Sequence, residues 1–223
     1  MAASEILPID GPDAFATAFA VSRETIARLM TYEALLRRWQ KTINLVAPRT
    51  LDDVWHRHFA DSAQLWGLRP DVAATWLDLG SGAGFPGLVL AILAAERGGT
   101  RHILVESDTR KAAFVREVAR EVGVAVDILC SRIESAETHF RVRTVDCVTA
   151  RALAPLPRLL PLVAPYFASH TVGLFLKGRD VAAELDAATS EGWVFVAERR
   201  PSLTDKDGSI LVLSRLRSKS LAK

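Results

Sequence analysis

The segment from Asp78 to Gly87, Asp-Leu-Gly-Ser-Gly-Ala-Gly-Phe-Pro-Gly, carries the residues best suited to binding a ligand. It follows a short apolar run and precedes an apolar stretch with helical character. In an open parallel sheet, ligands bind outside the carboxyl ends of the strands, next to turns of this kind. Glycine lets the backbone turn tightly and approach a ligand closely, and Pro86 suits the first turn of a helix. The segment therefore predicts a ligand-binding loop between a strand and a helix.

Two classes of nucleoside cofactor compete for this loop. Gly82, Gly84 and Gly87 satisfy the G-x-G-x-x-G pattern of dinucleotide binders. Asp78, Gly80 and the next two alternate glycines satisfy the acid-and-glycine pattern of S-adenosyl-L-methionine (SAM) binders. An acid at the strand end would repel a pyrophosphate, whereas it suits the cationic methionine end of SAM. We therefore favour SAM, and we keep a dinucleotide, and with it a NAD-dependent oxidoreductase, as the alternative.

Other chemistry-bearing residues support a nucleoside without choosing between these cofactors. Glu106 ends the second expected strand, where an acid can accept both ribose hydroxyls of an adenosine. His56 and His58 suggest a metal, but no cysteine or third histidine has suitable spacing. We therefore expect no metal site and hydrogen-bonded histidines, with Asp61 and its neighbours tying the N-terminal helices to the sheet.

The elements that must position these residues change character at about Thr75. Before it, apolar residues recur with helical spacing over 12–39, and a second helix is expected to end near Trp66. After it, apolar runs alternate with helical patterns. Strands are expected at 76–79, 103–106, 126–130, 145–150, 172–176, 193–198 and 210–214. Helices are expected between them at 86–96, 109–122, 155–166 and 180–189.

This alternation implies an α/β fold with a mainly parallel sheet covered on both faces. The last two strands have no helix between them, so they can pair antiparallel through the polar turn 204–208. Five alternating strands and a terminal hairpin are typical of the Rossmann-like class I SAM-dependent methyltransferase fold, with seven strands in all. We divide the chain into an N-terminal helical extension (1–74), a methyltransferase domain (75–216) and a basic tail (217–223).

Composition excludes several other classes of protein. The chain has 223 residues, of which 49% are hydrophobic and 24% charged, so it is not a largely disordered chain. Its two cysteines do not make a disulfide framework. No apolar stretch is long enough for a membrane span, and the absence of Lys or Arg before Arg23 argues against a signal peptide. We expect a cytoplasmic protein.

The net charge of +2 is too small to indicate a nucleic-acid partner, but its distribution is uneven. Residues 199–223 contain seven basic and two acidic residues, and residues 21–58 contain seven basic and four acidic ones. If the two segments meet in space, they could form a phosphate-binding surface. The alternative is two ordinary solvated faces and a basic tail.

Six motifs occur together in a fixed order. They are Asn44-Leu45-Val46, His58-x-x-Asp61-Ser62, the glycine loop 78–87, Arg132-Ile133-Glu134, Ala150-Arg151-Ala152 and Leu176-Lys177-Gly178. With them, residues 25–214 resemble the bacterial small-subunit ribosomal RNA guanine-N7 methyltransferases, the glucose-inhibited division protein B family. The resemblance implies SAM as cofactor, and N7 of the guanosine at position 527 of 16S ribosomal RNA as the methyl acceptor.

The resemblance also implies roles for individual residues. Gly80 and Phe85 would line the methionine and adenosine ends of SAM. Ile133 and Glu134 would lie beside the adenine, although the family usually has a small residue such as alanine at position 133. Arg151 would face both the cofactor and the target.

Methylation at guanine N7 makes small demands on the protein, because N7 has an in-plane lone pair and carries no proton. Neither a general base nor a cysteine nucleophile is required, and the stretch after the fourth strand has no Asn-Pro-Pro-Tyr motif. Catalysis then consists of positioning and desolvation. A cation near O6 can fix the base, and Arg151, Lys177 and Arg132 are the candidates. Alternatively, these cations form ion pairs with Glu106 or Glu134, or contact one another.

The expected partner is 16S ribosomal RNA or the small ribosomal subunit, bound by a monomer without a membrane or a metal. Two further functions stay open. An RNA- or ribosome-binding assembly factor with a vestigial cofactor site would keep the basic segments but would not need Asp78 or Glu106. A small-molecule methyltransferase or an oxidoreductase could be built on the same sheet.

Overall fold

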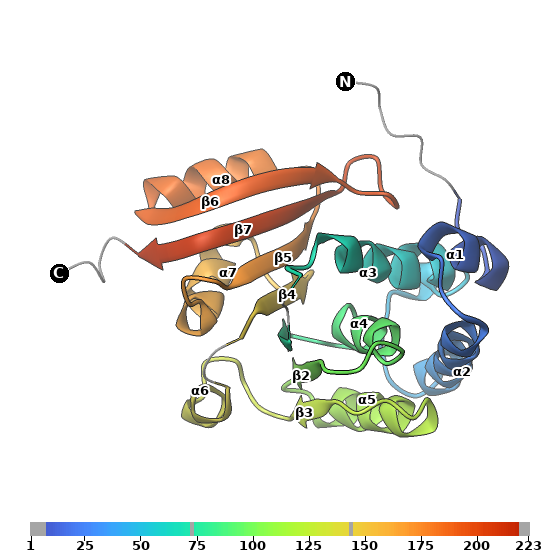
Figure 1. Ribbon diagram of the computed structural model, residues 1–223. Helices are drawn as coiled ribbons and strands as arrows, with labels where there is room; N and C mark the ends of the chain where they lie inside the picture. The colour runs from blue at the N-terminus through green and yellow to red at the C-terminus, as the bar shows by residue number, and fades with distance from the viewer. Residues whose placement is uncertain (1–7, 72–73, 143–144, 219–223) are drawn as a thin grey trace.

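One seven-stranded sheet organises the computed structural model, which describes residues 8–71, 74–142 and 145–218 (Figure 1). The strands are β1 (Thr75–Leu79), β2 (Arg101–Val105), β3 (Asp127–Leu129), β4 (Cys147–Arg151), β5 (Val172–Lys177), β6 (Trp193–Pro201) and β7 (Ser209–Ser218). Their order is β3-β2-β1-β4-β5-β7-β6. The first five strands are parallel, and β7 pairs antiparallel with both β5 and β6. The expected mainly parallel sheet with an antiparallel terminal hairpin is confirmed.

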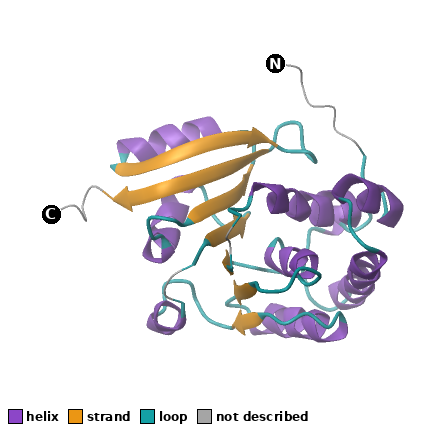
Figure 2. Cartoon of the chain, in the orientation of Figure 1, coloured by secondary structure: helices purple, strands orange, loops and turns teal. Residues whose placement is uncertain are grey.

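Helices cover both faces of this sheet (Figure 2). They are α4 (Gly87–Ala94), α5 (Thr109–Glu121), α6 (Ala136–Arg141), α7 (Leu156–Val163) and α8 (Val181–Ser190), with a 3₁₀ turn η4 (Ala164–Tyr166). The sequence did not predict α6, a short helix that Ser135 caps through the amide of Thr138. Six residues are too few for a recognisable apolar period. None of the helices within the described residues is long and apolar enough to cross a membrane.

The N-terminal extension contains two helices where the sequence predicted one over 12–39. They are α1 (Pro12–Phe19) and α2 (Arg23–Gln40). Ala20 adopts the left-handed conformation, with φ of 48°, and the Ser22 side chain accepts a hydrogen bond from the amide of Thr25. The apolar spacing continues across this break, so the local cap determines where α2 begins. A helical segment follows as η1 (Pro48–Thr50), the π-helical turn η2 (Trp55–Ala60), α3 (Asp61–Ala63) and η3 (Gln64–Leu68).

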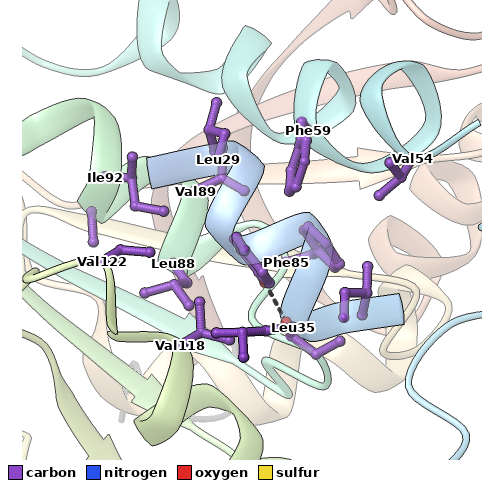
Figure 3. Close-up of a cluster of buried hydrophobic side chains, with 14 of the residues drawn as sticks. Leu29, Leu35, Val54, Phe59, Phe85, Leu88, Val89, Ile92, Val118 and Val122 are labelled. Carbon is purple, nitrogen blue, oxygen red and sulfur yellow. Dashed lines mark hydrogen bonds between the residues drawn. The ribbon is translucent and has the colours of Figure 1, made fainter. Parts of the chain in front are cut away.

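Helix α2 shares one hydrophobic core with the sheet domain (Figure 3). Leu29 and Leu35 of α2 belong to the same buried cluster as Phe85 of the glycine loop and Leu88 of α4. The extension is therefore packed onto the layer that carries the glycine loop. At the other end of the chain, β7 runs to Ser218, past the expected boundary at residue 216, and residues 219–223 of the expected tail lie outside the described part.

His102 of β2 is buried at one end of a stack of rings. Its ring centroid lies 5.7 Å from that of Trp76, which in turn stacks on Trp66. Among the described residues, its Nε2 has no hydrogen-bond partner. Burial lowers the pKa of His102 from 6.5 to about 4. The neutral ring therefore stabilises the fold fully above pH 6.5, and this stabilisation is lost as the pH falls toward 4.

We expect His102 to make unfolding easier in mild acid. Protonation of this imidazole in the unfolded chain should lower the free energy of unfolding by about 2 kcal/mol between pH 7 and pH 5. The variant His102→Phe keeps an aromatic ring beside Trp76 and does not titrate, so it should lose less stability over that interval. Urea denaturation at both pH values measures the difference, and the exposed imidazole of His170 provides the control variant His170→Gln. An equal loss in wild type and His102→Phe would rule out the buried imidazole as the cause.

Candidate functional site

The glycine loop connects β1 to α4 and is fixed at the carboxyl end of β2. The amides of Gly80 and Ser81 both donate to the carbonyl of Val105, at 3.0 Å. Gly80 and Gly82 have φ values of 69° and 58°, in the left-handed region that favours glycine. These conformations keep the loop close to the strand ends and leave the backbone open toward a ligand.

Asp78 lies beneath this loop, although it was expected beside the cofactor. It is 2% exposed, its Oδ1 accepts a hydrogen bond from Thr149 at 2.7 Å, and its Oδ2 accepts one from the amide of Gly87 at 3.1 Å. Burial raises the pKa of Asp78 to about 6, against the hydrogen bond from Thr149, which lowers it. The carboxylate therefore joins β1, β4 and the start of α4, and it shapes the loop from below.

Glu106 connects the loop to the end of β2, and its carboxylate can accept further hydrogen bonds. Its Oε2 accepts from the amide of Gly82, and its Oε1 accepts from the amide of Asp108, both at 2.7 Å. A carboxylate offers about four lone-pair sites. The two sites that these bonds leave over can accept two vicinal hydroxyls, as the sequence suggested for a ribose.

The ring of Phe85 is buried between other rings and is not exposed to the glycine-loop cavity. Its ring lies 5.3 Å from Tyr32 and 4.9 Å from His58, nearly parallel to both. The guanidinium of Arg151 lies 4.8 Å from its centroid. Gly84 is equally enclosed, because a Cβ there would lie 2.5 Å from the hydroxyl of Tyr32. Both residues thus support the loop, where the resemblance implied cofactor contact for Phe85.

Two cavities meet at the end of β4. The glycine-loop cavity, of about 300 Å³, is lined by Gly80, Gly82, Val105, Glu106, Ser107, Lys111, Ser131, Arg132, Ile133, Glu134, Arg151, Ala152, Leu153 and Leu162. The helix–sheet cavity, of about 410 Å³, is lined by Leu45, Val46, Ala47, Thr50, Arg57, His58, Asp61, Arg151, Ala152, Leu176, Lys177, Gly178, Ser202, Asp205, Gly208 and Ser209. Arg151 and Ala152 line both. A ligand in one cavity is therefore next to a ligand in the other.

Arg151 is held at this junction by the N-terminal helical segment. Its Nη1 donates to the carbonyl of Arg57 at 3.1 Å and lies 3.4 Å from Asp61 Oδ2, and its Nη2 lies 3.0 Å from His58 Nδ1. Only 18% of the side chain is exposed. The expected contact between the N-terminal helices and the sheet, through Asp61, is confirmed, and it converges on the arginine expected to face the target.

His58 accepts the hydrogen bond from Arg151 because a guanidinium can only donate. Burial, followed by the charge of Arg151, lowers the pKa of His58 to about 3, so the ring is neutral. Its proton is then on Nε2, which donates to Thr50 Oγ1 at 2.8 Å, and Thr50 in turn donates to the carbonyl of Ala47. The expectation of a hydrogen-bonded histidine is confirmed. Within the described residues, no group of three His, Cys, Asp or Glu could hold a metal ion.

Lys177 ends β5 and pairs with an acid that the sequence did not suggest. Its Nζ lies 2.7 Å from Glu184 Oε2 of α8 and 2.9 Å from the carbonyl of Ala154. The same carboxylate oxygen accepts from the amide of Leu156 at the start of α7. Lys177 therefore anchors the segment that follows Arg151, and it pairs with Glu184 and not with Glu106 or Glu134, the acids named in the alternative interpretation.

The motif after β3 belongs to the glycine-loop cavity. Ile133 is buried, and its carbonyl accepts a hydrogen bond from Tyr166 at 3.0 Å. Arg132 and Glu134 are exposed on either side of it. Arg132 thus shares the glycine-loop cavity with Arg151 and is separated from Lys177, which lines only the helix–sheet cavity.

The sequence did not identify the loop between β6 and β7 as part of the site. Thr204 Oγ1 donates to Asp61 at 2.8 Å, and Asp205 lies 3.4 Å from Arg57. The two basic segments, 21–58 and 199–223, do meet here, as one interpretation of the charge distribution proposed. Their contact includes the ion pair between Arg57 and Asp205, so the surface that they form together contains acidic as well as basic side chains. The polar turn was visible in the sequence, but its partner was not.

Comparison with known proteins gives a consistent family. A family described as rRNA small subunit methyltransferase G matches residues 25–206. The ribosomal RNA small subunit methyltransferase G of Parvibaculum lavamentivorans is 52% identical over 199 residues, covering 89% of this chain and 87% of the relative. That of Rhodospirillum centenum is 53% identical over 202 residues, covering 91% and 89%.

Solved structures share the fold at much lower identity. A TehB-like SAM-dependent methyltransferase from Corynebacterium glutamicum is similar with a TM-score of 0.55 and 13% identity, over 83% of this chain and 98% of that one. The fibrillarin/Nop5p complex contains a chain with a TM-score of 0.56 and 15% identity, over 71% and 81%. These similarities concern the fold alone.

Proposed function

The chain belongs to the rRNA small subunit methyltransferase G family, and on that premise we propose that it methylates N7 of the guanosine at position 527 of 16S ribosomal RNA. SAM is the methyl donor. The observation that carries the proposal is the junction at Arg151 and Ala152, where a cavity suited to a nucleoside adjoins one lined by charged, polar and apolar side chains. A cofactor and a target base would lie next to each other there.

The residues of the glycine-loop cavity fit SAM. Gly80 lines the cavity, and its φ of 69° lies in the left-handed region that favours glycine over a residue with a side chain. Glu106 has free lone pairs for the ribose, and Ile133 and Glu134 would lie beside the adenine. Asp78 would act by holding Gly87 and the loop. When bound, SAM supplies an electrophilic methyl group on a sulfonium.

The helix–sheet cavity would hold the guanine. Arg151 would donate to O6 alone, because the usual bidentate contact of arginine to O6 and N7 would occupy the methyl acceptor. The neutral ring of His58 and the carboxylate of Asp61 hold the guanidinium in place. Because N7 carries no proton, no residue has to act as a base, and the chain contributes by orienting the base and excluding water.

Lys177 and Arg132 would have different roles from Arg151. Lys177 would be a positioning residue, because its ammonium holds the segment after β4 through Ala154 and Glu184. Arg132 would act on the cofactor side, where it lines the cavity. The scheme requires neither a metal ion nor a second subunit, so we propose a monomer that acts on ribosomal RNA in the cytoplasm.

The test is methyl transfer from isotope-labelled SAM to small ribosomal subunits that lack the modification. We expect labelled 7-methylguanosine at one site after digestion of the RNA and mass spectrometry. Subunits that already carry the modification serve as the matched control and should take up no label. Binding of SAM without a labelled nucleoside, in subunits and in deproteinised RNA alike, would contradict the proposed substrate and leave only the fold.

A further inference from the structure

The loop 204–208 between β6 and β7 carries two aspartates, and each is paired with an arginine from another element. Asp205 Oδ2 lies 3.4 Å from Arg57 Nη1 of η2. Asp207 Oδ2 lies 3.8 Å from Arg179 Nη2, in the segment between β5 and α8. Arg57 lines the helix–sheet cavity, and Arg179 follows Gly178, which lines it too. Two carboxylates of one loop thus neutralise two arginines at the rim of one cavity.

The base of this loop is fixed, whereas its acidic side chains are accessible. The Thr204 carbonyl accepts from His56 Nε2 at 2.9 Å, and the Thr204 hydroxyl donates to Asp61 at 2.8 Å. The side chains of Asp205 and Asp207 are 42% and 50% exposed. Arg57 and Arg179 are 45% and 76% exposed. Both ion pairs are therefore open to exchange with an anion from solution while the loop stays docked.

We propose that Asp205 and Asp207 hold Arg57 and Arg179 in the free protein and release them to backbone phosphates of the RNA. The inference rests on the proposed function, since a nucleotide whose base enters the helix–sheet cavity brings a phosphate on each side of it past the rim. Exposed ion pairs are weak, and arginine matches the geometry of a phosphate closely. Each phosphate that binds an arginine releases its counterions, but the displaced aspartate takes counterions up, which offsets that release in the wild type.

Because the aspartates compete with phosphates for the arginines, the loop lowers the affinity of the protein for RNA. An RNA that presents phosphates at both arginines displaces both aspartates. An RNA that presents a phosphate at only one arginine gains only one phosphate contact, so it binds less tightly. The aspartates then lie near the phosphates, and their repulsion lowers affinity further. The loop accordingly reduces binding to RNA that does not fit the rim, at the cost of weaker binding to the proper substrate.

The experiment measures filter binding of small ribosomal subunits, as a function of KCl concentration, by Asp205→Asn, Asp207→Asn and the double variant. Asparagine at 205 keeps the side-chain oxygen that accepts from the amide of Asp207, so the turn is preserved. We expect the double variant to bind about three- to tenfold more tightly at low salt, with a slope of log K against log salt steeper by about 0.7 for each freed arginine. Arg57→Gln and Arg179→Gln should bind more weakly than wild type.

The matched control is Asp127→Asn, which frees Arg101 from an exposed ion pair of 2.7 Å. Both residues lie at the amino-terminal ends of β2 and β3, whereas the glycine-loop and helix–sheet cavities lie at the carboxyl ends of the parallel strands. Asp127→Asn removes one negative charge far from the rim, as each single loop variant removes one at the rim, and it should leave both affinity and slope close to wild type. Loop variants that bind no more tightly than Asp127→Asn, or that bind more weakly than wild type, would overturn the inference. Because binding is read directly, the result does not depend on methyl transfer, which the wild-type assay tests in parallel.

Discussion

Replacement of Arg151 by alanine should lower kcat/KM for methyl transfer about 100-fold or more, because a target base without its positioning contact is misplaced at the reacting atom. The affinity for SAM should fall much less, since Glu106 and the glycine loop stay in place. Arg151 is the one described side chain with hydrogen bonds to both Asp61 and His58 that also lines both cavities. Transfer kinetics on small subunits and calorimetric titration with SAM give the two quantities.

Two variants separate positioning by Arg151 from its structural contacts. Arg151→Lys keeps the charge but cannot reach His58, Asp61 and the Arg57 carbonyl together, so it should recover only part of the transfer rate. Arg101→Ala removes an exposed arginine at the far end of the sheet and should behave as wild type. Thermal melts check that the variants are folded. Equal losses in transfer and in SAM affinity would be incompatible with a role in placing the target.

The substitution Gly87→Ala should disable the cofactor side of the site. A Cβ at this position would lie 2.6 Å from Asp78 Cβ and 2.7 Å from its Oδ2. Asp78 is buried and bonded to Thr149 and to the amide of Gly87, so it cannot move aside without breaking those bonds. We expect the free energy of unfolding to fall by about 3 kcal/mol, as in an overpacked core. SAM affinity should fall about tenfold or more, because the loop above Asp78 has to shift.

Gly67→Ala is the control for this substitution. Gly67 lies in η3 outside the left-handed region, and a Cβ added there would have open space within 4 Å. Alanine there should change stability by less than about 1 kcal/mol and leave SAM binding intact. Chemical denaturation and calorimetry of both variants give the comparison. A Gly87→Ala protein as stable as Gly67→Ala would show that the contact between Asp78 and α4 is not rigid.

The sheet and the glycine loop could be predicted because they depend on local patterns. Apolar runs of strand length alternate with helical spacing, and the residues Asp78, Gly80 and Gly82 fall where a strand ends. The break between α1 and α2 was missed, because a single capping serine interrupts a continuing apolar period. Helix α6 was missed because it is short. Local rules therefore identified most elements and failed where one cap or one turn determined a boundary.

The partners of the charged residues could not be predicted in the same way. Lys177 pairs with Glu184, and Arg57 pairs with Asp205 from a loop 148 residues away. From the sequence, Arg151, Lys177 and Arg132 were all candidates for the cation near guanine O6. In the structure, Arg151 contacts His58 and Asp61, Lys177 pairs with Glu184, and Arg132 lines the glycine-loop cavity. The position of a charge along the chain does not determine which opposite charge the folded chain brings near.

The sequence by itself determined the fold class, the glycine loop, the nucleoside cofactor and the family, because these follow from residue types at short, fixed spacing. Only the tertiary structure decided that Asp78 and Phe85 support the loop from within, and that Arg151 lies between two cavities. It also decided that two aspartates of the β6–β7 loop form ion pairs with Arg57 and Arg179. The physical reason is that burial and ion pairing depend on contacts between segments far apart in the chain, which form only when the N-terminal helices and the β6–β7 loop dock onto the sheet.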